Sequence, residues 1–194
     1  MRILIAPDSF KESLSAKEVA LALKLGFEKA LPDTEFDLMP IGDGGEGTLD
    51  ALAENLNLEK KSIKIPHAYT SDGSVSFASN GQTAIFEMAA ASGLPLVPEE
   101  KRDPRYTTSY GTGEMIADAL RRGFRDISIA IGGSATNDGG IGCIRALGGK
   151  FLDENNQELK GCGEDLMKIR KIDLSGLNPL IKECKFTVMC DVTN

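Results

Sequence analysis

ISIAIGGSATNDGG, residues 127–140, is the stretch that decides the fold of this chain. Its isoleucines recur at every second position, at Ile127, Ile129 and Ile131, which predicts a strand because side chains alternate between the two faces of a sheet. A glycine-rich turn follows, and apolar residues then return at helical spacing over residues 141–147. A strand, a tight turn and a helix in this order form the repeating unit of an α/β fold.

The same order recurs along the rest of the chain. Apolar runs predict further strands at residues 3–6, 36–39 and 186–190. Helical periodicity follows the first two of these strands, and the pair Ser15 and Glu18 forms a capping-box pattern before the first helix. We therefore predict an α/β protein with a Rossmann-like or flavodoxin-like three-layer domain and a mostly parallel sheet.

Residues 60–100 interrupt this alternation. Three short strands are predicted there, at 62–65, 74–77 and 83–86, and the Asn80-Gly81 pair favours a hairpin turn. Such a meander indicates the start of a smaller domain inserted into the first. The expected division is residues 1–58 in the Rossmann-like domain, 59–104 in the β-rich start of the inserted domain, and 105–194 in the returning α/β part.

Composition excludes several classes of protein. The 194 residues carry a formal net charge of −7, which argues against sequence-independent nucleic-acid binding, because such binding depends on Lys and Arg neutralising phosphates. Aromatic residues make up only 6%, so a stacking platform for single strands is not expected either. The first apolar run is too short for a secretory signal, and no run is long enough to cross a membrane, so we expect a cytoplasmic protein.

Small polar and acidic residues collect directly after four of the predicted strands. They lie at residues 8–11, 42–48, 132–140 and 191–194. In open α/β sheets, ligands bind in the crevice outside the carboxyl ends of the strands. If the four strands lie parallel in one sheet, all four clusters face a single crevice.

The glycine-rich cluster carries the groups expected of an anion site. Gly132 and Gly133 let the backbone approach a ligand closely, and Ser134, Thr136 and Asn137 add hydrogen-bond donors near the start of a helix. The segment matches neither the GxxxxGK[ST] phosphate loop nor the GxGxxG dinucleotide fingerprint. The alternative is a turn that only starts the helix, with Asn137 as its N-cap.

Five acids stand at these strand ends: Asp8, Asp43, Glu46, Asp138 and Asp191. They would repel one another in one crevice, and Mg²⁺ would relieve that repulsion, because it binds carboxylates together with substrate phosphates. Three of these acids also have a plainer explanation. Those after the second strand could stabilise the first turn of a helix, and the one after the last strand could cap a neighbouring loop.

Five motifs stand out by their length and unusual composition. They are IAPDSFK at 5–11, DGGEGT at 43–48, TTSYGTGE at 107–114, GGSATNDGG at 132–140 and CDVTN at 190–194. Together, and in this order, they resemble the type 1 glycerate kinase family over essentially the whole chain. The resemblance implies ATP- and Mg²⁺-dependent phosphorylation of D-glycerate to 2-phosphoglycerate, in a site between two α/β domains. Family members are considerably longer, so we expect this chain to be the N-terminal part of such a protein, truncated at residue 194.

On this resemblance, the expected catalytic residues are Asp191, Lys11 and Asp8. Asp191, with Asp8 as the second candidate, would deprotonate the glycerate hydroxyl, and Lys11 would offset charge on the phosphoryl group or the glycerate carboxylate. Mg²⁺ would be held by Asp43 and Glu46. Substrate or phosphate would be bound by Ser9, Gly132, Gly133, Ser134, Thr136, Asn137 and Asp138. The alternatives are a sugar-acid binding protein without catalysis and an inactive fragment of the kinase, and a homo-oligomer is left open.

Overall fold

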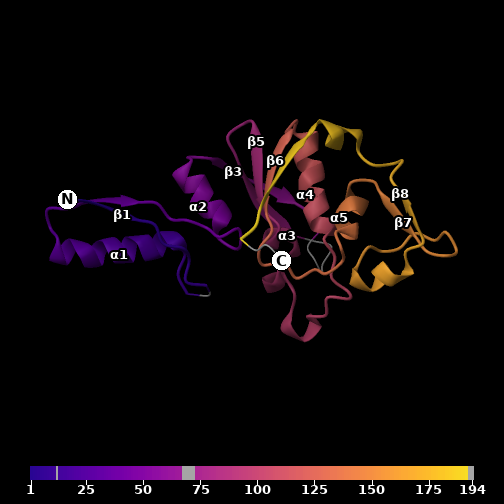
Figure 1. The fold of residues 1–194 in the computed structure, drawn as a ribbon, viewed down its shortest axis with the longest axis horizontal. Helices are drawn as coiled ribbons and strands as arrows, with labels where there is room; N and C mark the ends of the chain where they lie inside the picture. Colours follow the sequence, from indigo (N-terminus) through magenta and orange to yellow (C-terminus); the bar gives the residue numbers. More distant parts are fainter. Residues whose placement is uncertain (12, 67–72, 192–194) are drawn as a thin grey trace.

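The computed structural model describes residues 1–11, 13–66 and 73–191 (Figure 1). Its strands are β1 (Arg2–Ile5), β2 (Glu35–Leu38), β3 (Glu59–Lys64), β4 (Ser74–Ser79), β5 (Thr83–Glu87), β6 (Asp126–Ala130), β7 (Lys150–Leu152), β8 (Lys171–Asp173) and β9 (Lys185–Met189). Its α-helices are α1 (Ala16–Ala30), α2 (Thr48–Asn55), α3 (Ala89–Ser92), α4 (Tyr110–Arg121) and α5 (Ile141–Ala146). Short 3-10 helices lie at Leu94–Leu96, Glu99–Lys101, Gly163–Lys168 and Pro179–Glu183.

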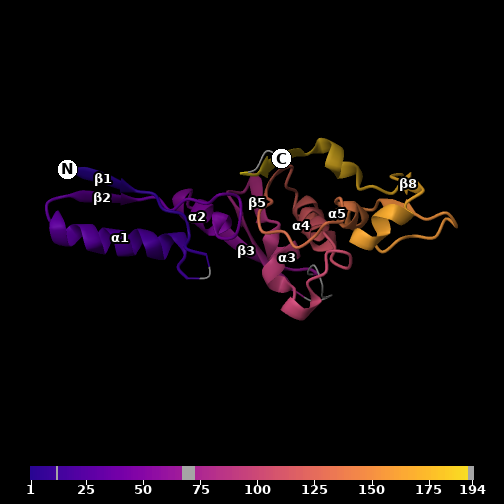
Figure 2. The same cartoon turned by 60° about the horizontal axis from the view of Figure 1, so that its bottom comes forward.

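The first two strands form a unit apart from the other strands. β1 and β2 pair in parallel as a two-stranded sheet, and α1 lies along it (Figure 1, Figure 2). The predicted capping box is confirmed: the Ser15 hydroxyl oxygen accepts from the Glu18 N–H, and the Glu18 carboxylate accepts from the Ser15 N–H. Phe27 of α1 stacks on Phe36 of β2, with ring centroids 6.3 Å apart. We call β1, α1, β2 and the residues that connect them the arm.

Most of the other strands form one five-stranded sheet, in the order β3-β4-β5-β6-β9. β3, β4 and β5 are successive antiparallel neighbours, as the predicted meander requires. β5, β6 and β9 are parallel, and Ile129 of β6 lies opposite Phe86 of β5 and Val188 of β9. The carboxyl ends of these three parallel strands therefore lie at one edge of the sheet, where ligands bind in α/β proteins.

Helices cover both faces of this sheet. Met115 of α4 packs in one hydrophobic cluster with Phe77 and Phe86, and each of the three is at most 1% exposed. Leu49 of α2 packs in a second cluster with Ala78. Because Phe77 and Ala78 are consecutive in β4, they point to opposite faces of the sheet, so α4 and α2 form the two outer layers. The predicted α/β class is confirmed.

A smaller unit follows α5. β7 and β8 pair antiparallel, and Phe151 of β7 packs with Ile141 of α5 and with Leu159 in a third cluster. In the residues that the structure describes, no helix is both long enough and apolar enough to span a membrane.

The expectation that one sheet carries all four polar strand ends is wrong. β1 is parallel to β2, and β6 is parallel to β9, but the two pairs belong to separate sheets. Periodicity predicts strands without their partners, because pairing joins segments that are far apart in the sequence. Residues 59–104 contribute β3, β4 and β5 to the same sheet as β6 and β9. The division into domains at residues 58 and 104 stays a prediction.

Candidate active site

Three strand-end loops meet backbone to backbone where the arm joins the five-stranded sheet. The Gly132 N–H donates to the Gly44 carbonyl oxygen at 2.8 Å, and the Ile131 N–H donates to the Met189 carbonyl oxygen at 3.2 Å. A Cβ atom on Gly132 would lie 2.7 Å from the Gly45 Cα, and one on Gly44 would lie 3.0 Å from the Met189 oxygen. Positions 44 and 132 therefore require glycine for this approach. The loops after β2, β6 and β9 come together, although their strands belong to two sheets.

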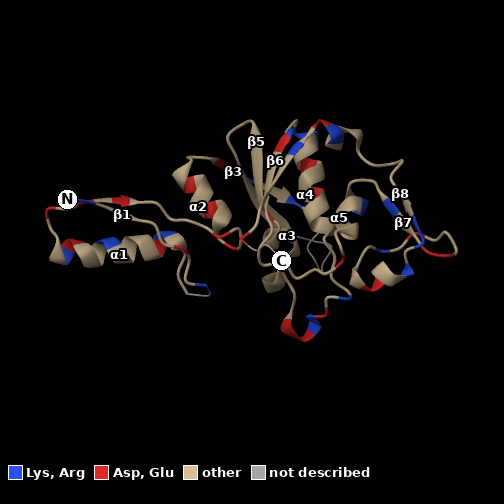
Figure 3. Cartoon of the chain, in the orientation of Figure 1, with Lys and Arg blue, Asp and Glu red and all other residues tan. Residues whose placement is uncertain are grey.

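The segment between β2 and α2 is acidic (Figure 3), and Asp43 belongs to it. Its Oδ1 atom accepts the Gly45 N–H at 2.8 Å, and its Oδ2 atom lies 3.3 Å from the Lys11 Nζ atom. The Gly45 N–H lowers the pKa of Asp43; partial burial opposes this effect, and Lys11 lowers the pKa further. Asp43 is therefore ionised at neutral pH and available to a cation.

Asp191 faces the same space as Asp43. A cleft of about 480 Å³ lies between the start of α2 and the end of β9. Asp43 and Thr48 line it from one side, and Val188 and Asp191 line it from the other. The last residues of the predicted CDVTN motif, 192–194, lie outside the described residues.

A second cleft, of about 450 Å³, is linked to the first by the ion pair between Lys11 and Asp43. Ser9, Lys11, Glu46 and Glu87 are among its lining residues, and Lys11 also pairs with Asp43. Two residues assigned to different roles, Lys11 and Glu46, therefore share one cleft.

The Asp8 carboxylate forms a hydrogen bond within its own turn. Its Oδ1 atom accepts the Ser9 N–H at 2.6 Å, and its side chain is half-buried. This bond fixes Ser9, which lines the second cleft. In this structure, Asp8 shapes the turn that presents Ser9.

The glycine-rich segment lies along a third cleft, of about 380 Å³. Ser134, Thr136 and Asn137 line this cleft together with Val188, and Val188 also lines the cleft that holds Asp43 and Asp191. The Ser134 hydroxyl oxygen accepts the Thr136 N–H at 3.1 Å, which folds the segment into a tight turn. Ser134 and Asn137 are exposed. The third cleft, toward α4, and the first, toward α2, thus share one lining residue, Val188 of β9.

The helix after this segment begins at residue 141, as its apolar spacing predicts, and not directly after Asn137 as the N-cap alternative requires. α5 starts at Ile141, and Gly140 precedes it, so Asn137 is not the N-cap. Gly139 and Gly140 have φ values of 60° and 78°, which a right-handed helix does not allow. Residues 134–138 are therefore a loop that belongs to the cleft rather than the first turn of a helix.

Asp138 is held inside the protein. The residue is only 2% exposed, and its Oδ2 atom accepts the Ser109 N–H and hydroxyl, each at 2.8 Å, and the Gly142 N–H at 3.2 Å. Its Oδ1 atom accepts the Gly140 N–H at 3.0 Å. Four donors occupy the carboxylate, so Asp138 fastens the glycine-rich segment to the start of α4. Asp138 also lines the third cleft, and its contact with substrate stays a prediction.

Glu87 is a site residue that the sequence reasoning missed. It ends β5, and its Oε1 atom accepts the Leu49 N–H at 2.6 Å, at the start of α2. Burial raises the pKa of Glu87, which lines the second cleft with Lys11. The signal in the sequence was an acid directly after the apolar strand residues 84–86, the same pattern that marked the other strand ends.

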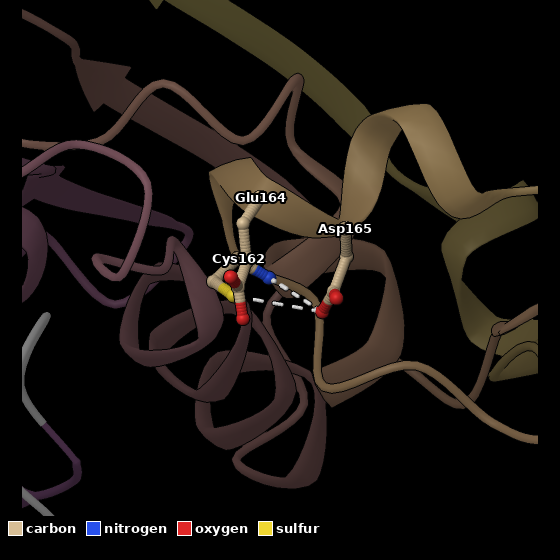
Figure 4. Close-up of side chains that lie close together, drawn as sticks. All are labelled: Cys162, Glu164 and Asp165. Atoms are coloured by element: carbon tan, nitrogen blue, oxygen red, sulfur yellow. Dashed lines mark hydrogen bonds between the residues drawn. The ribbon is translucent and has the colours of Figure 1, made fainter.

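A different group of side chains has the spacing of metal ligands. Within the described residues, ligand atoms of Cys162, Glu164 and Asp165 lie within 4.8 Å of one another (Figure 4). The Asp165 Oδ2 atom, however, accepts the Gly161 N–H at 3.0 Å and the Cys162 thiol at 3.5 Å, and its Oδ1 atom accepts from Lys168 at 3.1 Å. These bonds cap the 3-10 helix at Gly163–Lys168, so the group is explained by helix capping.

Comparison with known proteins identifies the family. The sequence matches the Glycerate kinase family over residues 3–194. The chain belongs to this family. Glycerate 2-kinase of Escherichia coli (strain K12) is 50% identical over 196 residues, which are 100% of this chain and 51% of that protein. Glycerate kinase of Bacillus subtilis (strain 168) is 46% identical over 196 residues, with the same coverage of 100% and 51%.

A solved structure agrees with these relatives. A crystal structure from Salmonella typhimurium LT2 that carries the name glycerate kinase 2 superposes with a TM-score of 0.85 at 44% identity. The match covers 100% of this chain and 52% of that one. The chain thus spans about half the length of the curated glycerate kinases it matches.

Proposed function

We propose that the protein containing this chain transfers the γ-phosphoryl group of ATP to the 2-hydroxyl group of D-glycerate. Membership of the glycerate kinase family supports the substrate, and the name of the Escherichia coli relative, glycerate 2-kinase, supports the position. One observation carries the proposal for this chain: the backbone contact between Gly44, Gly132 and the end of β9. The loops that it joins carry a lysine partner, carboxylates and hydroxyl groups that line three clefts, and phosphoryl transfer requires such positioning and charge neutralisation.

The glycine-rich segment binds phosphate oxygens in this proposal. Ser134 and Asn137 are exposed at the third cleft, where their side chains can donate to an anion. Thr136 lines the same cleft, and Gly132 and Gly133 directly precede Ser134 in the segment. Four donors compensate the negative charge of Asp138 inside the protein. An anion in the cleft therefore meets donors rather than a bare carboxylate.

Lys11 supplies the positive charge next to the transferred group. Its side chain is 66% exposed and lies 3.3 Å from the Asp43 carboxylate. An exposed ion pair of this kind contributes about 0 to 1 kcal/mol, so the ammonium group can exchange the carboxylate for a phosphoryl oxygen at little cost. Ser9, in the same cleft, adds a hydroxyl group.

Asp43 and Glu46 are the residues that would hold Mg²⁺. Mg²⁺ is commonly bound by one or two carboxylates together with substrate phosphates, and these two side chains provide oxygen ligands of that kind. Asp43 fits the role because its lowered pKa keeps it ionised. When bound, the metal neutralises charge on the phosphate oxygens.

Asp191 accepts the proton of the substrate hydroxyl group. It is exposed in the cleft that it shares with Asp43, where a glycerate hydroxyl can approach it. The hydroxyl proton moves to the Asp191 carboxylate, the oxygen forms a bond to the γ-phosphorus, and the bond from that phosphorus to the bridging oxygen of ADP breaks.

The proposal is tested by coupled detection of ADP release. The assay uses the 194-residue chain, and also a longer protein in which the unmatched half of the Escherichia coli relative is joined to it. We expect ADP release that requires both D-glycerate and Mg²⁺ in the longer protein. Binding of D-glycerate without any ADP release would instead favour the non-catalytic sugar-acid binding protein, and activity of the longer protein alone would mark the 194-residue chain as an inactive half.

Two variants of the longer protein test the assigned roles. Asp191→Asn and Lys11→Ala should each lower turnover at least about tenfold, because each removes a group that acts on the reacting atoms. Glu154→Gln and Lys182→Ala are matched controls, exposed and remote from the three clefts, and should leave turnover unchanged. Turnover of Asp191→Asn and Lys11→Ala within about threefold of the unchanged protein, less than a 1 kcal/mol effect, would reject both roles.

A further inference from the structure

A fourth cleft borders the glycine-rich segment. Its volume is about 270 Å³, and Ser134, Thr136 and Asn137 line it as they line the third cleft. Val97 and Arg102 are also among its lining residues. Pockets for whole ligands usually occupy about 300 to 1,000 Å³, so a cleft of this size holds one group of a ligand. A ligand that lies on the glycine-rich segment can therefore extend from the third cleft into the fourth.

Arg102 brings a positive charge to this cleft. Its Nε atom donates to the Val97 carbonyl oxygen at 3.3 Å, and Val97 is only 1% exposed, so a buried residue holds the guanidinium group at its Nε end. Among the residues that the structure describes, no acidic side chain pairs with Arg102, and no hydrogen bond engages its two terminal nitrogens. These nitrogens therefore keep their N–H donors for a ligand.

The acidic residue at this cleft is already compensated. Asp103 lines the cleft, and both of its carboxylate oxygens accept from Arg105: Oδ1 from the Nε atom at 3.0 Å, and Oδ2 from the Nη2 atom at 2.6 Å. These hydrogen bonds lower the pKa of Asp103, which stays ionised and paired. The charge of Arg102 is thus left over at the cleft, in a chain whose formal net charge is −7. A local positive charge of this kind favours an anionic ligand.

The shape of the donors suits an oxyanion. The planar fork of a guanidinium group matches two oxygens of one phosphate or carboxylate group. Asn137, which is exposed at the same cleft, adds the two donors of its side-chain amide. The reactants of the proposed activity carry both kinds of oxyanion, the carboxylate of glycerate and the phosphates of the nucleotide, so the position of the cleft decides between them.

The position of the fourth cleft favours the nucleotide. Asp191, which accepts the substrate proton in the proposed function, lines the first cleft, and among the described residues the first and fourth clefts share none. Glycerate has only three carbons, so its carboxylate stays near the first cleft when its hydroxyl group lies at Asp191. A nucleotide instead extends away from the transferred phosphoryl group. We propose that Arg102 binds a phosphate group of the nucleotide next to the glycine-rich segment. Because the nucleotide belongs to the proposed activity, this assignment rests on the proposed function.

Steady-state kinetics of Arg102→Ala in the longer protein tests the assignment. We expect the KM for MgATP to rise at least about tenfold, because a charge-assisted contact is lost, while kcat and the KM for D-glycerate stay within about threefold. Arg102→Lys keeps the charge and loses the fork, so it should recover only part of the loss. Arg170→Ala is the matched control and should leave both KM values unchanged. Within the described chain Arg170 also lacks an acidic partner, and it is exposed and lies outside the four clefts.

Binding measurements separate this assignment from the proposed activity, because they need no turnover. Calorimetric titration uses ADP and inorganic tripolyphosphate, which has no nucleoside. Each should bind the unchanged longer protein at least about tenfold more tightly than the Arg102→Ala variant. If this difference is found in a protein that releases no ADP with D-glycerate, the proposed activity fails and Arg102 still binds phosphate.

Two results would overturn the assignment. A rise in the KM for D-glycerate in place of the KM for MgATP would place the substrate carboxylate at Arg102. Equal titrations of the unchanged protein and the Arg102→Ala variant, with either ligand, would show that Arg102 is a solvated loop residue.

Discussion

Gly132→Ala tests the contact that brings the strand-end loops together. The new Cβ atom would lie 2.7 Å from the Gly45 Cα and 2.9 Å from both the Gly44 oxygen and the Gly45 nitrogen. An ordinary contact is at least 3.4 Å, so one loop must move by about 0.7 Å, and all three obstructing atoms belong to the backbone. The φ angle of Gly132 is not positive, so the effect of the substitution is steric rather than a result of backbone strain.

This displacement has a calculable effect on stability and on turnover. Overpacking costs typically about 1 to 3 kcal/mol, and lengthening the bond from the Gly132 N–H to the Gly44 oxygen would add about 1 kcal/mol. A misplacement of about 1 Å in an active site can reduce the rate by about a hundredfold, so we expect at least a tenfold loss of turnover in the longer protein. Urea unfolding of the chain and coupled ADP release measure the two effects.

Gly26→Ala is the matched control for this substitution. Nothing lies within 4 Å of a Cβ atom at that position, which is exposed in the interior of α1. The control should leave stability unchanged or raise it by up to about 1 kcal/mol, because alanine favours a helix over glycine. The reasoning is refuted if Gly132→Ala behaves like this control in both assays.

Two further substitutions and one labelling experiment probe individual side chains. Burial raises the pKa of Glu87 above 4.5, so the folded state holds its proton more tightly than the unfolded chain does, and stability falls as pH rises from the ordinary pKa to the raised one. The Glu87→Gln variant should not lose stability over this pH range, and it should be more stable than the unchanged protein at neutral pH. Urea unfolding midpoints of both proteins between about pH 4 and pH 8 would show this. The expectation is contradicted if the two midpoints change with pH in parallel. Asp138→Asn should cost about 2 to 3 kcal/mol in urea unfolding, because in either orientation its NH2 group faces a backbone donor, Gly140 in the less crowded one, and a loss below about 0.5 kcal/mol would contradict the bracing role. Burial raises the pKa of the Cys143 thiol to about 11, so iodoacetamide at neutral pH should alkylate it much more slowly than the exposed Cys190, as mass spectrometry of labelled peptides would show; equal rates would contradict its burial.

Local patterns predicted the individual elements well. The Ser15 and Glu18 capping box, the meander after residue 60 and the strand at Ile127 and Ile129 are all present, because each depends on residues close together in the sequence. The partners of the strands could not be predicted in this way. β1 and β2 form a sheet of their own, and no local pattern distinguishes that arrangement from one continuous sheet.

The sequence predicted which residues form the candidate site better than it predicted the contacts that hold them together. Asp43 and Asp191 line one cleft, yet their loops are joined through the loop after β6, by the bonds from Gly132 to Gly44 and from Ile131 to Met189, and this closeness is tertiary. Asp138 has the same local signature as the other strand-end acids. Its donors come partly from Ser109, 29 residues earlier, so its role as a brace could be seen only in three dimensions.

The roles assigned to the two acidic loops depend on their forming a single site with the glycine-rich segment. Turnover of D-glycerate with MgATP by the Asp43→Asn and Asp191→Asn variants of the longer protein measures this most directly, with Glu154→Gln as the control. One site predicts that both variants lose at least about tenfold in turnover and remain folded. Normal turnover in either variant would show that its loop lies outside the site of phosphoryl transfer.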